Sequence, residues 1–122
     1  MSLVIDSSVW INYFFEKDKK NKSAHYIQSQ ENVYIPTLVL SEVYKKIKKS
    51  VNESEALTAI IQLKKRILVP LDEEIALVAG DVAIEYKLAM ADSIVYATAL
   101  RFKAKLVTAD NDFRGLPQTV IL

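Results

Sequence analysis

Apolar residues gather in five short runs along the chain, and segments with helical patterns separate the first four runs. The runs cover residues 3–5, 33–35, 67–71, 106–108 and 119–122. Runs that are apolar throughout are typical of strands buried on both faces, and helices between them are typical of parallel pairing. The pattern therefore predicts an α/β fold, a three-layer α/β/α sandwich with a mainly parallel five-stranded sheet.

The segments between the runs carry signals that start helices. Asn52, with Glu55 three positions later, resembles a capping box, and Asp72 with two glutamates behind it suits the first turn of another helix. Thr37 can cap a third helix directly after the second run. Further helices are expected at about residues 8–15, 23–29 and 90–102. The helix after Asn52 is expected to bury its large apolar residues Leu57, Ile60 and Ile61.

Length and composition limit the class of protein. A chain of 122 residues that is 51% hydrophobic predicts a single domain over residues 1–122. The sequence has no cysteine, which excludes disulfides, thiol nucleophiles and cysteine zinc sites. No stretch is long and uncharged enough to cross a bilayer, and the first residues lack the pattern of a signal peptide. We therefore expect no membrane association and a cytoplasmic location.

Charge is unevenly distributed, although the net charge is only +1. Residues 1–66 carry 11 basic and 7 acidic side chains, whereas residues 67–122 carry 5 and 8. Two runs supply most of the positive excess, namely Lys17, Lys19, Lys20 and Lys22, and Lys45, Lys46, Lys48 and Lys49. Lysine is common on ordinary surfaces, so both runs can be plain solvated surface. The second run follows Glu42 on the same expected helix and is also a candidate for binding phosphate groups.

Four acidic residues from distant parts of the chain are expected at one edge of the sheet. Parallel strands end at the same edge, and the helix that follows a strand begins there. Asp6 directly follows the first run, and Asp110 lies two residues after the fourth run. Asp92 lies in the first turn of the helix that leads to the fourth run, and Glu42 lies in the second turn after the second run. Their carboxylates should therefore meet.

Carboxylates held close together need a positive charge, because each pair at ~4 Å repels by several kcal/mol at an effective dielectric near 20. No lysine or arginine lies within four residues of Asp6 or Asp92. A divalent cation would relieve the repulsion, and Mg²⁺ or Mn²⁺ suits an oxygen-only site better than zinc. Such a site suits metal-assisted hydrolysis of phosphodiesters. The sequence therefore predicts a Mg²⁺ or Mn²⁺ site formed by Asp6, Glu42, Asp92 and Asp110.

Each acid also has an ordinary structural explanation. Asp6 and Asp92 can cap helices, and Glu42 can pair with Lys46 one turn later on the same helix. Asp110 can belong to a plain turn. The edge that the four acids are expected to share, rather than any one of them, favours a functional site.

Four segments that carry these acids resemble PIN-domain nucleases, and most of all the toxins of VapBC toxin–antitoxin modules. The segments are VIDSSV at 4–9, SEV at 41–43, ADSIVYATA at 91–99 and LVTADNDF at 106–113. The resemblance covers essentially the whole chain, with the segments in order and at suitable separations. It departs from the family at Ala109, where a basic residue often precedes the last acid.

The resemblance implies an endoribonuclease whose metal-activated water hydrolyses RNA and leaves a 5′-phosphate and a 3′-hydroxyl. The metal ligands and catalytic residues would be Asp6, Glu42, Asp92 and Asp110, with Ser8, Thr108 and Asp112 as accessory residues. Lys45, Lys46, Lys48 and Lys49 would then guide RNA toward the site. A homodimer and a cognate antitoxin are implied by the same kinship. Similar domains process RNA in other settings, so a non-toxin RNA-processing nuclease is the alternative.

Three other acid-based sites fit the sequence poorly. A phospho-receiver signalling domain needs paired acids after the first strand, but Ser7 and Ser8 follow Asp6. A haloacid-type phosphatase needs a second acid where Ser8 stands. An EF-hand loop starting at residue 110 would have Arg114 at a ligand position and Ile121 in place of the bidentate glutamate.

The aromatic residues near the first helix leave three possibilities open. Trp10, Tyr13 and Phe14 are spaced as one face of a helix, which is more typical of a core stripe than of a base-stacking platform. In a dimer, some of them could instead form the interface. The single His25 has no partner of a matching type for zinc binding or acid–base catalysis and is expected to be an ordinary helix residue.

Overall fold

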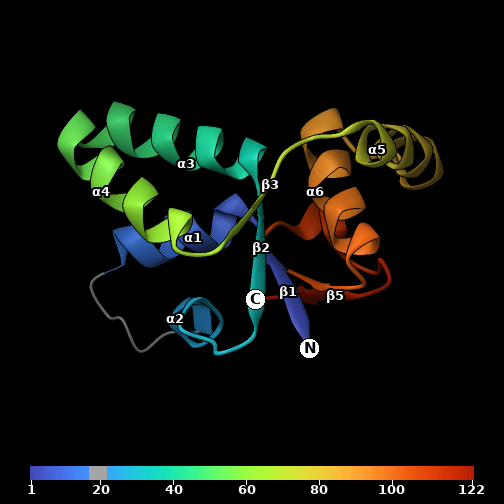
Figure 1. Cartoon of the computed structure of the whole chain (residues 1–122), viewed down its shortest axis with the longest axis horizontal. Coiled ribbons are helices and arrows are strands. Elements are labelled where there is room, and N and C mark those ends of the chain that lie inside the picture. The colour runs from blue at the N-terminus through green and yellow to red at the C-terminus, as the bar shows by residue number, and fades with distance from the viewer. Residues whose placement is uncertain (17–21) are drawn as a thin grey trace.

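The computed structural model describes residues 1–16 and 22–122 and contains one five-stranded sheet with helices around it (Figure 1). Its elements in chain order are β1 (Ser2–Ile5), α1 (Ser7–Phe15), α2 (Lys22–Ile27), β2 (Asn32–Pro36), α3 (Thr37–Ser50), α4 (Glu53–Lys64), β3 (Ile67–Val69), α5 (Glu73–Tyr86), α6 (Met90–Arg101), β4 (Lys105–Thr108), the 3₁₀ turn η1 (Asn111–Phe113) and β5 (Thr119–Ile121). Lys17, Lys19 and Lys20 of the first basic run lie outside the described residues.

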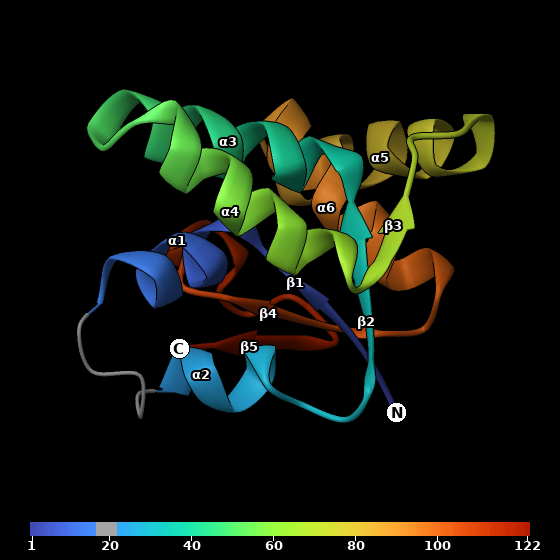
Figure 2. The same cartoon turned by 60° about the vertical axis from the view of Figure 1, so that its left-hand side comes forward.

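The sheet has the strand order β3-β2-β1-β4-β5, and all four pairings in the described chain are parallel. Helices α1, α3 and α4 lie on one side of the sheet, and α5 and α6 lie on the other (Figure 1). The turned view shows α3 and α4 packed side by side (Figure 2). The α/β/α architecture expected from the apolar runs is therefore confirmed.

β1 occupies the centre of the sheet because its residues tolerate burial on both faces. Leu3, Val4 and Ile5 are all buried, and Val4 pairs with Tyr34 of β2 on one side and Leu106 of β4 on the other. Asp6 follows this strand directly, so it lies at the middle of the edge where the parallel strands end. We call this edge the carboxyl rim.

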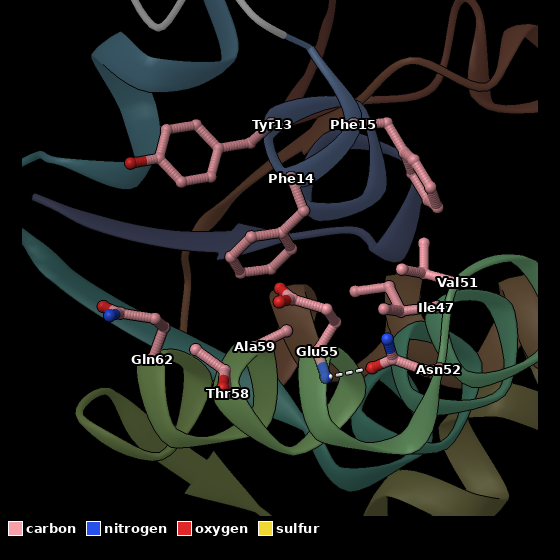
Figure 3. A pocket seen from close by; sticks show the side chains of 10 residues that line it. All are labelled: Tyr13, Phe14, Phe15, Ile47, Val51, Asn52, Glu55, Thr58, Ala59 and Gln62. Atoms are coloured by element: carbon pink, nitrogen blue, oxygen red, sulfur yellow. Dashed lines mark hydrogen bonds between the residues drawn. The ribbon is translucent and has the colours of Figure 1, made fainter.

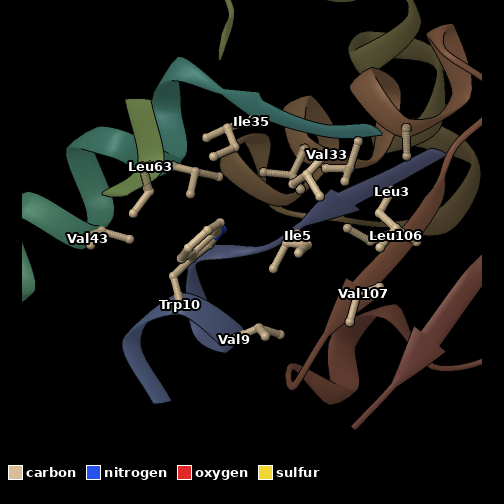
Figure 4. Close-up of a cluster of buried hydrophobic side chains, with 14 of the residues drawn as sticks. Leu3, Ile5, Val9, Trp10, Val33, Ile35, Val43, Leu63, Leu106 and Val107 are labelled. Carbon is tan, nitrogen blue, oxygen red and sulfur yellow. The ribbon is translucent and has the colours of Figure 1, made fainter. Parts of the chain in front are cut away.

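The core is built where α1 packs between the sheet and the α3–α4 pair. Trp10 of α1 is 1% exposed and lies among Ile35 of β2, Val43 of α3 and Leu63 of α4 (Figure 4). Trp10 is thus a core residue, whereas Tyr13 and Phe14 are only partly buried. The aromatic stripe of the first helix is therefore divided between core and surface.

All three of these expected helices form, but only two of the three expected caps are confirmed. The side chain of Asn52 accepts a hydrogen bond from the Glu55 N–H at 2.8 Å, and that of Asp72 accepts one from the Ile75 N–H at 2.9 Å. Thr37, in contrast, is the first residue of α3 and does not cap it. Pro36 takes the cap position and makes no side-chain hydrogen bond there.

The expected burial of α4 is wrong for two of its three large apolar residues. Leu57 is 48% exposed and Ile61 is 59% exposed, while Ile60 is half-buried. The buried residues of α4 are instead Ala56, Ala59 and Leu63. These positions also follow helical spacing, and the small alanines allow α4 to approach α3 closely. Periodicity alone did not distinguish this face from the one with the larger side chains.

The third strand is shorter than the apolar run that predicted it. β3 ends at Val69, Pro70 follows, and Leu71 is about half exposed. Proline has no N–H to donate to a neighbouring strand, and β3 lies at an edge of the sheet where burial is incomplete.

Among the described residues, no helix is both long enough and apolar enough to span a bilayer.

We predict that two substitutions on α4 have very different effects on stability. Leu63→Ala should lower the free energy of unfolding by about 2–5 kcal/mol, because it leaves a cavity beside Trp10. Ile61→Ala should change it by less than about 0.5 kcal/mol, because this side chain faces solvent. Urea denaturation of both variants measures the difference, and equal losses would contradict the packing of α4.

Candidate functional site

Five acidic side chains lie at the carboxyl rim and come from four separate parts of the chain. Asp6 is the N-cap of α1, Glu42 lies in the second turn of α3, and Asp92 lies in the first turn of α6. Asp110 caps η1, and Asp112 lies within that turn. We call these five residues the rim acids.

Asp6 is the most constrained of the rim acids. It is 5% exposed, and its Oδ1 accepts a hydrogen bond from the Ser7 N–H at 2.8 Å. Its Oδ2 accepts hydrogen bonds from the hydroxyls of Ser8 at 3.0 Å and Thr108 at 2.8 Å. Burial raises the pKa of Asp6, and these hydrogen bonds oppose the rise. The carboxylate is therefore held in one orientation by three donors.

The same two hydroxyls fix the chain around the last acids. Ser8 Oγ accepts a hydrogen bond from the Ala109 N–H, and Thr108 Oγ1 accepts one from the Asp110 N–H, both at 3.0 Å. Ser8 and Thr108 thus connect the end of β1 to the end of β4. Their contacts position the backbone from which Asp110 projects.

Asp92, Asp110 and Asp112 form the tightest group of acids. Each offers a carboxylate oxygen, and these oxygens lie within 4.8 Å of one another. Burial, followed by the charges of Asp110, Asp6, Asp112 and Glu42, raises the pKa of Asp92 to about 6. The site therefore resists holding all of its negative charges at once.

Glu42 faces the same group from α3. Burial raises the pKa of its carboxyl, the charge of Asp6 raises it further, and a hydrogen bond from the Ser7 side chain lowers it. Ser7 thus contacts both Asp6 and Glu42, a role that the sequence reasoning missed. Its place directly after an acid at a helix start was the available signal.

The rim acids have no cationic partner within the described part of the chain. The salt bridge found there joins Arg101 to Glu74, and neither residue belongs to the rim. The alternative in which Glu42 simply pairs with Lys46 is therefore not what the structure contains. Uncompensated negative charge is the main electrostatic feature of this edge.

The donor set fits a hard divalent cation. Three carboxylate oxygens within 4.8 Å of one another can share one ion, and oxygen-only ligands favour Mg²⁺ or Mn²⁺ over zinc. The tight group includes Asp112, which the resemblance implied only as accessory, and it omits Asp6 and Glu42. All the expected acids thus lie at one edge, but the tight group is not the set of four expected metal ligands.

Comparisons with known proteins place this chain in a family. The family model for the PIN domain matches residues 3–118. No curated protein matches the sequence. Several solved structures share the fold, although their sequence identities are below 25%.

The similar structures include two toxin–antitoxin complexes and one toxin. A toxin–antitoxin complex from Klebsiella pneumoniae superposes with a TM-score of 0.81 at 23% identity, covering 97% of this chain and 95% of the other. VapBC2 from Rickettsia felis, solved bound to promoter DNA, gives 0.79 at 14% identity and covers 100% and 98%. The sarcin–ricin loop cleaving toxin VapC20 from Mycobacterium tuberculosis gives 0.75 at 14% identity and covers 94% and 95%. With the family model spanning nearly its full length, the chain belongs to the PIN domain family, a family of nucleases.

Proposed function

We propose that this protein is a metal-dependent endoribonuclease and the toxin of a toxin–antitoxin pair. The observation that carries the nuclease proposal is the group of Asp92, Asp110 and Asp112, with their carboxylate oxygens within 4.8 Å and no cationic partner in the described chain. The toxin proposal is supported by the similarity to solved toxins and toxin–antitoxin complexes.

The residues present fit a Mg²⁺ or Mn²⁺ ion. Asp92, Asp110 and Asp112 would hold the ion, and Asp6 and Glu42 would add negative charge beside it. When bound, such an ion supplies Lewis-acid activation of water and neutralises charge on a phosphoryl group. The negative rim itself would repel a phosphate, so placing the scissile phosphate at the rim would depend on that neutralisation.

The chain itself would contribute by holding the carboxylates of the rim in fixed orientations. The hydroxyls of Ser8 and Thr108 both donate to Asp6 Oδ2, which leaves this carboxylate little freedom to rotate. Asp110 accepts a hydrogen bond from the Asp112 N–H at 2.9 Å, which sets the relative positions of two carboxylates. Hydrolysis at this edge would add water to phosphorus and release the 3′-oxygen, leaving a 5′-phosphate and a 3′-hydroxyl.

A groove away from the rim supports the proposal of an antitoxin partner. It encloses about 540 Å³ between the end of α1 and helix α4. Tyr13, Phe14 and Phe15 line it from α1, facing Thr58 and other residues of α4 (Figure 3). Aromatic residues that line an open groove are typical anchors for a partner chain.

We predict that Asp6→Asn or Asp92→Asn reduces Mn²⁺-dependent RNA cleavage by about a hundredfold or more, because each change removes negative charge from the proposed metal site. EDTA should abolish cleavage by the wild-type protein. Cleavage of a labelled RNA on denaturing gels measures both effects. Asp81→Asn, at an exposed position of α5, is the matched control and should cleave normally. Cleavage that survives EDTA or either rim substitution would refute the mechanism.

We also predict that the rim makes stability depend on pH and metal. The pKa of Asp92 in the folded protein is about 6, above its ordinary value of 3.8, so the metal-free protein gains stability as pH falls through about 6 toward 4. Near neutral pH in EDTA, Asp92→Asn should therefore raise the melting temperature, and this gain should shrink at acidic pH. Mn²⁺ should raise the melting temperature of the wild type more than that of the variant. A lower melting temperature for Asp92→Asn than for the wild type, in EDTA near neutral pH, would contradict repulsion among the rim acids.

A further prediction concerns binding of the partner in the groove. Thr58→Arg should weaken binding of the protein encoded by the adjacent gene by about tenfold or more, because it fills the groove with a charged side chain. RNA cleavage by the free variant should be unchanged. Leu57→Arg, at an exposed neighbouring position that does not line the groove, is the matched control. Equal binding by the two variants would place the partner elsewhere.

A further inference from the structure

The basic run on α3 divides into two faces, and only one of them adjoins the rim. Lys45, Lys46 and Lys49 follow Glu42 by three, four and seven positions, which places all four residues on one side of a helix. Lys48 lies on a different side, where its Nζ donates to Tyr44 Oη at 3.3 Å and lies 5.3 Å from the centre of that ring. We call Lys45, Lys46 and Lys49 the lysine face.

A hollow of about 380 Å³ joins the lysine face to the carboxyl rim. Its lining includes Glu42 and Ser7 at one end and the three lysines along α3. Lys48 does not line it. Ser7 is also a hydrogen-bond donor to Asp6, so the hollow begins beside the buried acid of the rim.

The lysine face carries positive charge that no acid in the described chain neutralises. None of its three ammonium groups forms a salt bridge with a described residue, and all three side chains are exposed. Positive charge beside an uncompensated acidic edge would ordinarily be drawn into ion pairs with it. Because the three lysines form no ion pair with the rim acids among the described residues, they are available to an anionic ligand that reaches both regions.

We propose that the lysine face binds the phosphate backbone of single-stranded RNA next to the scissile bond. The four positions from Lys45 to Lys49 advance about 6 Å along the helix axis. That is longer than the rise of one stacked nucleotide, about 3.4 Å, so the lysines can accompany more than one phosphate. This inference rests on the proposed nuclease function and adds the direction in which the substrate leaves the rim, along α3 toward Ser50.

The test compares two triple variants with the same change in net charge. One replaces the lysine face (Lys45→Gln, Lys46→Gln and Lys49→Gln), and the other replaces exposed lysines elsewhere (Lys48→Gln, Lys64→Gln and Lys105→Gln). Binding of a short fluorescein-labelled single-stranded RNA is measured by anisotropy in EDTA over a range of KCl concentrations. Cleavage of the same RNA is measured with Mn²⁺, and thermal melts establish that both variants are folded.

The lysine-face variant should bind RNA about tenfold or more weakly, and its plot of log K against log salt should be shallower by about 2, since each lost phosphate contact removes about 0.7. Its KM should rise while kcat changes little. The control variant should stay close to wild type in both slope and KM.

Three results would overturn the proposal, and each can be distinguished from the others. If the wild type cleaves RNA with Mn²⁺ but the two triple variants bind it equally, the phosphate-binding face is wrong and the nuclease function stands. If the wild type neither binds nor cleaves RNA, both proposals fail. Loss of binding to the adjacent-gene protein, with RNA binding intact, would assign the lysines to an acidic segment of that partner and would also overturn the RNA proposal.

Discussion

Repulsion among the rim acids is the physical constraint around which this structure is arranged. Two carboxylates within 4.8 Å of each other repel by roughly 3 kcal/mol or more at an effective dielectric near 20, and solvent screens the exposed Asp112 further. Several such pairs are comparable with the whole stability of a small domain, about 5–15 kcal/mol. The raised pKa of Asp92 shows how the protein lowers that energy without a cation. A fold that keeps this arrangement must supply compensating stability from its core.

The compensation comes from the central strand and the helix that follows it. β1 is buried on both faces, and α1 places Trp10 in the core directly after Asp6 caps the helix. Ser8 and Thr108 then bind Asp6 to the end of β4. The most deeply buried acid is therefore also the one with the most hydrogen-bond donors. These hydrogen bonds offset the free-energy cost of burying a carboxylate. The acids with fewer contacts are left nearer to solvent, where a metal ion can reach them.

Helices α1 and α3 each connect the rim to a different surface. α1 begins at Asp6, passes through the core at Trp10 and ends in the aromatic groove that faces α4. α3 begins near the rim, presents Glu42 to it and then presents the lysine face beside the adjoining hollow. The proposed RNA path starts at the rim and runs to Ser50, and the proposed partner groove lies away from the rim and is lined in part by Val51.

The sequence by itself determined the class of fold and the edge at which the acids lie. Continuous apolar runs indicated a parallel sheet buried on both faces, and parallel strands end at one edge, so Asp6 and Asp110 were expected at the same edge of the sheet. The helix starts at Asn52 and Asp72 were also local properties, since a cap needs only its own next turn.

Only the tertiary structure decided which faces and which side chains meet. Helical spacing on α4 allowed either large or small residues to face inward, and packing against α3 chose Ala56 and Ala59 over Leu57 and Ile61. Likewise, only the folded chain brings Asp112 of η1 within ligand distance of Asp92 of α6. Periodicity defines the faces of an element, but the partner that covers a face, and the atoms within ligand distance, depend on contacts between segments far apart in the chain.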